Sequence, residues 1–416
     1  MAGVEKGSGA PSGRPRSGLQ RSEVARIGLY DAYLATLGGG ENLLAVLTEL
    51  LEEELPQADI EIVTHREGFV PLARLTERFG ITLDRTRVRT IQPGHRHRRA
   101  PFHPLRRFLH ERDVARLSSQ YDLFVNNTVF SVAPAQARYS VYMCMFPLTA
   151  EPWELRQRPL RRRLFFPYVA LRRRLYRRWV GTYDLLLAIS RFTQRWIRDL
   201  WDLDSELLYP PVETRPDLSL AGKEKKILAI GRFFPGNHNK KHDVLIEAMR
   251  ALQDRGLEGW RLHLVGGRTP VEGTDAYLDH LQGLARGLPV DFHVDAPRRE
   301  LEELLETSSL FWHATGFGEQ PDLQPEKLEH FGITTVEAMG HGCVPLAFEC
   351  GGQPEIIRQG ETGYLWRTRE ELLDHTLYLA HHRDLRTALA RAAHTRSRDF
   401  SRLAFKSRAR QLLGLS

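Results

Sequence analysis

Residues 226–246, KILAIGRFFPGNHNKKHDVLI, contain the pattern that decides the fold. The run 226–230 is short and apolar, as a buried strand is, and it leads into Gly231-Arg232 and then into Asn239-Lys240-Lys241. In open parallel sheets the ligand lies at the carboxyl ends of the strands. An arginine and a lysine at that edge would neutralise a diphosphate, although ordinary solvated charge is the alternative for any single pair of cations.

Runs of this kind recur along the whole chain and alternate with helical patterns. Such alternation is the signature of βαβ units and parallel sheets. Because there are two series of strands, we expect an α/β protein of two Rossmann-like domains. The predicted strands are residues 26–30, 60–64, 122–126, 139–144 and 184–190, then 226–230, 261–265, 290–294, 310–313 and 343–348.

The prolines between the two series predict the domain boundary. Tyr209-Pro210-Pro211 and Arg215-Pro216 suit neither a helix nor a central strand, because proline fixes φ and lacks the N–H donor. A chain of 416 residues is also long enough for two cores. We expect a disordered tail at 1–22, domains at 23–209 and 217–398, a linker at 210–216, and a C-terminal helix at 399–416 that packs back on the first domain. Helical patterns span residues 377–393 and 403–413.

Composition excludes several classes of protein. No apolar run approaches the roughly 20 residues that span a bilayer, and the N-terminal 21 residues lack the apolar core of a secretory signal. The three cysteines, Cys144, Cys343 and Cys350, show neither a disulfide framework nor zinc-ligand spacing. We therefore expect a cytoplasmic protein.

The positive charge lies in two clusters of the first half. Residues 85–116 and 151–180 each contain ten arginines against two acidic residues, a net +8 each, which leaves the remainder of this +7 chain at −9. A balance of this kind indicates an anionic partner on that side, either a membrane surface, a phosphorylated acceptor or a nucleic acid.

Two further stretches bear on chemistry. The first is Leu37-Gly38-Gly39-Gly40-Glu41, glycines between a strand and a helix, which suit close approach to a phosphate and equally a tight turn. The second is Glu329-His330-Phe331-Gly332-Ile333-Thr334-Thr335-Val336-Glu337. Two carboxylates eight residues apart can each accept hydrogen bonds from a different group of sugar hydroxyls, although either alone could be an ordinary first-turn carboxylate.

The Glu-x7-Glu spacing continues into Ala-Met and Gly-x-x-Pro, with Gly-Arg upstream and Gly-Gly-x-x-Glu downstream. As a set, these motifs resemble the retaining glycosyltransferases of family 4, and the resemblance covers nearly the whole chain. It implies the GT-B architecture, in which two Rossmann-like domains face each other across a donor and acceptor cleft. It also implies transfer of a hexose from a nucleoside diphosphate sugar to a glycan, a lipid-linked molecule or another hydroxyl acceptor, in polysaccharide or glycoconjugate biosynthesis.

The resemblance carries over to individual residues. It implies that the backbone of Gly39 and Gly40 contacts the donor, that Arg232 and either Lys240 or Lys241 bind the diphosphate, and that Glu329 binds the sugar hydroxyls. Phe331 and Gly332 would donate backbone N–H groups, and Glu337 would hold the ribose. His313 and Ile333 complete the expected donor site, and no metal or other cofactor is expected. The stretch Trp312-His313-Ala314-Thr315 departs from the more usual Pro-Ser, and the histidine that some members place near the acceptor is absent from residues 143–147.

The arginine-rich stretch 151–180 gives a further expectation. Between residues 167 and 180, Tyr168, Leu171, Leu175 and Trp179 recur at helical spacing, and five arginines, Arg172, Arg173, Arg174, Arg177 and Arg178, cover much of the rest. A basic amphipathic helix of this kind can dock on the inner face of the cytoplasmic membrane, whereas a packed helix with a solvated outer face shows the same stripe.

Three other functions stay open at this point. A sugar phosphorylase could use the same phosphate-binding groups. A nucleic-acid-binding protein would explain the calculated isoelectric point near 9.4, but it would leave the glutamate pair without a role, so we expect no nucleic-acid partner. A catalytically inactive relative would not need the intact donor motifs.

Overall fold

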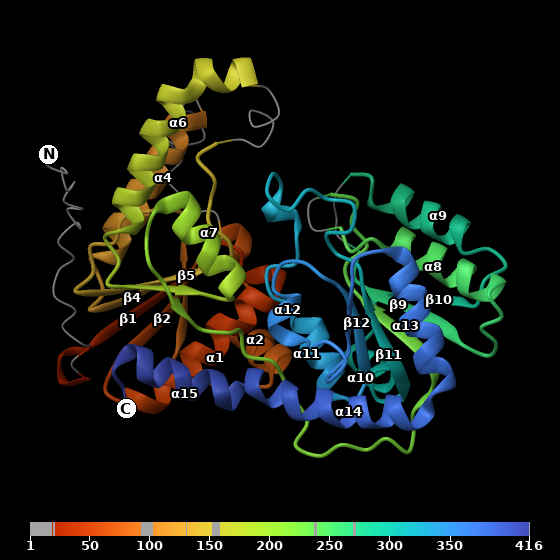
Figure 1. The fold of residues 1–416 in the computed structure, drawn as a ribbon. Helices are drawn as coiled ribbons and strands as arrows, with labels where there is room; N and C mark the ends of the chain where they lie inside the picture. Colours follow the sequence, from red (N-terminus) through yellow and green to blue (C-terminus); the bar gives the residue numbers. More distant parts are fainter. Residues whose placement is uncertain are drawn as a thin grey trace, which may run out of the picture.

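The computed structural model describes residues 19, 21–92, 103–129, 131–151, 159–236, 239–268 and 272–415. They form two α/β domains, each built on one parallel sheet with helices on both faces (Figure 1). The expected fold class is confirmed.

The N-terminal domain contains a seven-stranded sheet in the order β3-β2-β1-β4-β5-β6-β7. In that order the strands are Arg87–Ile91, Asp59–His65, Arg26–Tyr30, Leu123–Asn126, Tyr139–Cys144, Leu185–Ala188 and Glu206–Leu207. The helices are α1 (Gly39–Glu54), α2 (Leu72–Phe79), α4 (His103–Ser118), α6 (Pro159–Val180) and α7 (Arg191–Trp201).

The C-terminal domain repeats the plan with six strands, β10-β9-β8-β11-β12-β13. In that order they are Val290–Val294, Arg261–Gly266, Glu224–Ile230, Ser308–His313, Val344–Phe348 and Tyr364–Trp366. In each sheet the strand order changes direction between two neighbouring strands, β1 and β4 in one domain and β8 and β11 in the other. Such switch points are where open α/β sheets bind ligands. The helices are α8 (His242–Asp254), α9 (Thr274–Leu284), α10 (Arg298–Thr307), α11 (Ile333–Gly340), α12 (Gln353–Ile356), α13 (Arg369–His381) and α14 (Arg383–Ser397). The last helix, α15 (Arg402–Leu413), packs on the N-terminal domain.

All ten expected strands are present, with ends that move by up to two residues, but three other strands were missed. Strand β3 reads Arg-Val-Arg-Thr-Ile and lies at the edge of its sheet, so it lacks the apolar run of a central strand. Strands β7 and β13 are only two and three residues long. The single helix expected over 377–393 is wrong, because His382, at φ −114° and ψ 79°, separates α13 from α14.

The two ends of the chain meet on the N-terminal domain. Helix α15 lies along α1, where Lys406 pairs with Glu49 at 2.7 Å and Arg410 with Glu54 at 2.5 Å (Figure 1). At the other end Leu19 is buried and Arg21 pairs with Glu54, so the expected tail of 22 residues is too long; residues 1–18 and 20 lie outside the described residues.

The chain crosses between the domains twice, and the two crossings touch. Val212, in the linker, donates its backbone N–H to the carbonyl of Phe400, just before α15, and forms a parallel bridge with Ser401. The relative position of the two domains is thus held by backbone hydrogen bonding as well as by side chains.

Helix α6 projects from the N-terminal domain beside α4 (Figure 1). Its C-terminal half joins the core, because Tyr176 and Val180 are buried and the Trp179 ring packs near Phe108, with centroids 6.1 Å apart. The expected apolar face over 167–180 is therefore only partly free. The exposed apolar side chains lie further toward the helix N-terminus, and residues 152–158 lie outside the described residues.

Candidate active site

The candidate site lies where the carboxyl ends of both sheets face each other. In the C-terminal domain, β8 ends at Ile230 and the chain continues through an exposed Arg232 to Lys240. The Lys240 ammonium lies 2.6 Å from a carboxylate oxygen of Glu329, a residue 89 positions further along the chain.

Glu329 has two positively polarised partners. Besides Lys240, Nε2 of His313, the last residue of β11, lies 3.0 Å from the same Oε2 atom. Burial by itself would raise the pKa of Glu329, but Lys240 and His313 outweigh it and hold that pKa well below its usual value of 4.5. Burial in turn lowers the pKa of His313. The cluster therefore presents an ionised carboxylate beside a neutral imidazole and a lysine.

The motif alone did not distinguish Lys240 from Lys241, but in the structure the two lysines have different partners. Lys241 stands at the N-cap of α8 with φ 54°, and its ammonium lies 2.7 Å from Glu319, which also receives Lys327 at 3.2 Å. Lys240, and not Lys241, therefore pairs with Glu329, the predicted sugar-binding residue.

Two helix N-termini meet across the domain boundary. Helix α1 begins at Gly39 and α11 begins at Ile333, and a Cβ atom added to Gly39 would lie 2.4 Å from Cδ1 of Ile333. A side chain at residue 39 would therefore have to push the end of the Ile333 side chain aside. The amide N–H groups of a first helical turn have no partner within the helix and favour anions, so the two ends together suit a phosphate.

The loop between Glu329 and α11 has a conformation that glycine favours. Gly332 has φ 121°, and a Cβ there would meet Nε2 of Gln353 at 2.3 Å. Gln353 is fully buried, and neither of its side-chain polar atoms has a protein partner among the described residues. The side chain of Phe331 packs into the core against Tyr209 and Phe400, so only its backbone remains for a ligand.

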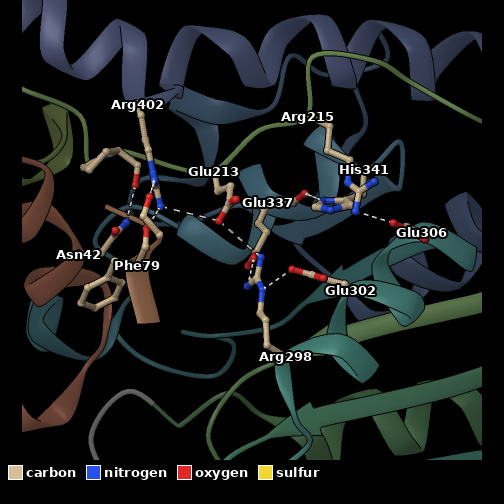
Figure 2. Close-up of polar contacts among 12 residues, drawn as sticks. Asn42, Phe79, Glu213, Arg215, Arg298, Glu302, Glu306, Glu337, His341 and Arg402 are labelled. Carbon is tan, nitrogen blue, oxygen red and sulfur yellow. Dashed lines mark hydrogen bonds and ion pairs between the residues drawn. The ribbon is translucent and has the colours of Figure 1, made fainter. Parts of the chain in front are cut away.

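The second glutamate of the pair is not adjacent to the first. Glu337 lies on α11 with its side chain 12% exposed, and its Oε1 atom accepts a hydrogen bond of 2.6 Å from Arg298, the first residue of α10 (Figure 2). Arg298 was not predicted, although its place directly after β10, at the ligand-binding edge, was a usable signal.

A second unpredicted group lies in the N-terminal domain. Asp31 follows β1 and is buried; its carboxylate accepts from the Asn127 side chain at 2.7 Å, and Asn127 also donates to the Gly40 carbonyl at 3.1 Å. Burial, with Glu41 next in importance, raises the pKa of Asp31 to about 7. Burial likewise raises the pKa of Glu41, whereas the charge of Arg232 across the cleft opposes the rise. The glycine loop is thus held by Asp31, which acts through Asn127, and by Glu41, which accepts from the backbone N–H of Gly38 and interacts with Arg232 of the other domain.

Two contacts hold the domains together beside this site. The His330 ring stacks on Phe146, with centroids 4.3 Å apart and planes 13° apart. The Glu355 carboxylate accepts backbone N–H groups of Arg191 and Phe192 at the start of α7, both at 2.8 Å, and the Tyr209 hydroxyl at 3.1 Å. Residues flanking the predicted sugar-binding loop therefore contact the N-terminal domain.

The described residues contain no group of three or more His, Cys, Asp or Glu side chains suited to a metal ion. Across the same part of the chain, no helix is both long and apolar enough to cross a membrane. The site instead offers cations, helix N-termini and two separate carboxylates, a set suited to a ligand that carries both phosphate and hydroxyl groups.

Comparison with known proteins gives matching results. The family model of the glycosyl transferases group 1 matches residues 212–396. The chain is 29% identical over 210 residues to a Xenopus laevis protein named GDP-Man:Man(3)GlcNAc(2)-PP-Dol alpha-1,2-mannosyltransferase, which covers 46% of this chain and 40% of that protein. It is 26% identical over 230 residues to human alpha-1,3/1,6-mannosyltransferase ALG2, covering 46% of this chain and 50% of the relative. The chain thus spans two fifths to one half of the length of these relatives.

Solved structures share the fold. Anabaena Alr3699/HepE in complex with UDP-glucose aligns over 94% of this chain and 99% of its own, with a TM-score of 0.66 at 18% identity. Sucrose-phosphate synthase from Thermosynechococcus elongatus aligns over 94% and 100%, with a TM-score of 0.64 at 15% identity. At these identities the likeness concerns the fold, which is that of the two-domain glycosyltransferases.

Proposed function

We propose, from the premise that residues 212–396 belong to the glycosyl transferases group 1 family, that the chain is a retaining glycosyltransferase. It would move a hexose from a nucleoside diphosphate sugar to a hydroxyl group of a glycan or lipid-linked acceptor. The observation that carries the proposal is the cluster of Lys240, Glu329 and His313 opposite the glycine loop of the other domain.

Each group has a role that its chemistry suits. Glu329, kept ionised by Lys240, accepts hydrogen bonds from sugar hydroxyls. Lys240 and Arg232 face the diphosphate, and the N-termini of α1 and α11 add backbone N–H groups. Glu337 accepts from the ribose hydroxyls. The buried orphan atoms of Gln353, beneath Gly332, are satisfied when a polar ligand fills the loop.

The chemical step follows from the leaving group. The bond between the anomeric carbon and the diphosphate oxygen breaks, a bond to the acceptor oxygen forms on the same face, and the acceptor proton passes to the departing diphosphate. Positive charge grows on the sugar and negative charge on the diphosphate. Cations and helix N-termini fixed beforehand around that phosphate stabilise the transition state more than the ground state.

The relatives suggest which substrates to test first. GDP-mannose is the donor and a dolichyl-diphosphate oligosaccharide the acceptor in the name of the Xenopus laevis relative, whereas the Anabaena structure contains UDP-glucose. We propose GDP-mannose with a short polyprenyl-diphosphate oligosaccharide as the first pair, with UDP-glucose as the competing donor.

The direct test is transfer of labelled sugar by purified wild-type protein and two variants. We expect Glu329→Gln and Arg232→Gln to lower kcat/KM by about 30-fold to 1,000-fold, which corresponds to about 2–4 kcal/mol of lost transition-state stabilisation. Arg255→Gln is the matched control, because Arg255 forms a surface ion pair with Asp374 in the same domain. Wild-type rates in both site variants, or an equal loss in the control, would contradict the proposal.

We further propose that the tip of α6 docks on an anionic membrane, where a lipid-linked acceptor is presented. Between residues 160 and 171, Leu160, Leu164, Phe165, Phe166, Tyr168 and Leu171 are each at least 45% exposed. Exposed arginines, among them Arg163, Arg173 and Arg174, lie on the same helix. Two attractions hold a helix in the membrane interface. Apolar side chains are buried between the headgroups, and cationic side chains interact with anionic headgroups.

Vesicle cosedimentation tests this docking. We expect binding to vesicles that contain phosphatidylglycerol and weak binding to phosphatidylcholine alone. Replacing Leu160, Leu164 and Phe166 with serine should abolish most binding, whereas Leu403→Ser, at an exposed position on α15, should not. Equal binding to both vesicle types, or unchanged binding by the triple variant, would show that α6 has another role.

A further inference from the structure

Arg298 is the point at which four charged groups meet (Figure 2). Its guanidinium donates to Glu337 at 2.6 Å and to Glu302, one turn along α10, at 2.9 Å, and it lies 3.8 Å from Glu213 in the linker. Glu213 in turn lies 3.8 Å from Arg402 of α15. Arg298 could therefore act on the donor site through Glu337 or on the domain arrangement through the linker.

Distance and exposure decide between these routes. The Glu337 side chain is 12% exposed and in direct contact, whereas Glu213 is 64% exposed and 3.8 Å away. An exposed pair at that distance is screened by water and contributes little, whereas a short hydrogen bond to a nearly buried carboxylate is screened much less and is costly to lose. The strong interaction of Arg298 is the one with Glu337.

The backbone fixes both partners. Leu304 and Leu305 of α10 pack in one core cluster with Ala338 of α11, so the two helices cannot drift apart without exposing apolar surface. A guanidinium offers a planar set of donors that orients a carboxylate, which an ammonium at the same place does not. The oxygen atoms of Glu337 are thus aimed before any ligand arrives.

We propose that Arg298 is a positioning residue of the donor site, which acts through Glu337 by holding its carboxylate oriented for the ribose hydroxyls. This inference rests on the proposed function. It predicts that Arg298 matters for donor binding and little for the chemical step, because the ribose is remote from the anomeric carbon.

A double-mutant cycle tests the inference. We expect Arg298→Gln to raise the donor KM about tenfold and to change kcat by less than about threefold. The double variant with Glu337→Gln should bind donor no more weakly than Glu337→Gln alone, because two residues that act as one unit are not additive. Arg298→Lys should restore charge but less than half of the affinity loss on a logarithmic scale.

Two further variants separate the alternatives. Glu213→Gln should change the donor KM by less than about twofold; an effect as large as that of Arg298→Gln would mean that Arg298 acts through the linker. Glu306→Gln is the matched control, since Glu306 lies on the same helix as Arg298 but forms its ion pair with Arg215, at 2.5 Å (Figure 2).

The outcomes distinguish this inference from the function on which it rests. Calorimetry with GDP and UDP reports nucleotide binding without turnover. If the wild-type protein binds neither nucleotide and transfers no sugar, the proposed function fails and the inference with it. If the wild-type protein binds and transfers while Arg298→Gln keeps the wild-type donor KM, or the double variant loses the sum of both single effects, the inference alone is overturned. A thermal melt of each variant confirms that it folds.

Discussion

The two adjacent lysines offer a sharp test of the site, because their ion pairs are nearly identical. Lys240 lies 2.6 Å from Glu329, with side chains 22% and 16% exposed; Lys241 lies 2.7 Å from Glu319, with 21% and 17%. By distance and burial alone, replacing either lysine with methionine should cost the fold a similar amount, about 1–3 kcal/mol. The cost for Lys241 should be at the lower end, because Lys327 remains beside Glu319.

Activity should separate the two variants. Lys240→Met removes a cation from the diphosphate site and a partner from Glu329, so kcat/KM should fall about 30-fold to 1,000-fold, from about 2–4 kcal/mol at 1.36 kcal/mol per tenfold. Lys241→Met should stay within about threefold of wild type. The assay is sugar transfer at saturating acceptor, with thermal melts to compare the stability of both variants. A loss in Lys241→Met equal to or greater than that in Lys240→Met would refute the assignment of Lys240.

The same pair predicts a pH effect on stability. The pKa of Glu329 is depressed in the folded protein, so its stabilising contribution is present above the unfolded pKa near 4.5 and is lost as the pH falls through the folded value. Lys240→Met lacks most of this contribution at every pH. The difference in Tm between wild type and Lys240→Met should therefore shrink between pH 7 and about pH 3, and a constant difference would mean that Lys240 does not hold Glu329 ionised.

The remaining predictions concern other parts of the site. The product should keep the anomeric configuration of the donor, as NMR of the glycoside would show; an inverted product would rule out a retaining mechanism. Activity should survive dialysis against EDTA, and its loss, with recovery on adding a divalent cation, would contradict metal independence. Gly39→Ala should lower activity about threefold or more, because its Cβ would lie 2.4 Å from Cδ1 of Ile333 and would displace that side chain; adding Ile333→Ala should restore part of the activity, and no recovery would mean that the conflict lies elsewhere. Asp31→Asn should raise Tm more at pH 8 than at pH 5, because a carboxyl whose pKa rises from 3.8 to about 7 on folding destabilises the fold increasingly between those two values and fully above pH 7; an equal change at both pH values would show that the pKa of Asp31 is not raised.

Much of the fold follows from patterns a few residues long. A central parallel strand is buried on both faces, so apolar runs such as Ile227–Ile230 mark it without any knowledge of its neighbours. Edge strands escape this rule, and for that reason Arg87–Ile91 was missed. The chain order of strands and helices then places Arg232, Lys240 and Glu329 at the carboxyl edge of one sheet, because every parallel strand ends there.

What the sequence by itself determined is therefore which residue types stand at the ligand-binding edges. Only the tertiary structure decided which of them share a partner. Lys240 and Lys241 are neighbours in sequence, yet the left-handed backbone at Lys241 helps send one ammonium to Glu329 and the other to Glu319, 89 and 78 residues away. Asp31 meets Asn127 across 96 residues, and Arg298 meets Glu337 across 39. Such pairs depend on how two sheets and their helices pack, and a periodicity of two or 3.6 residues contains no information about contacts over those separations.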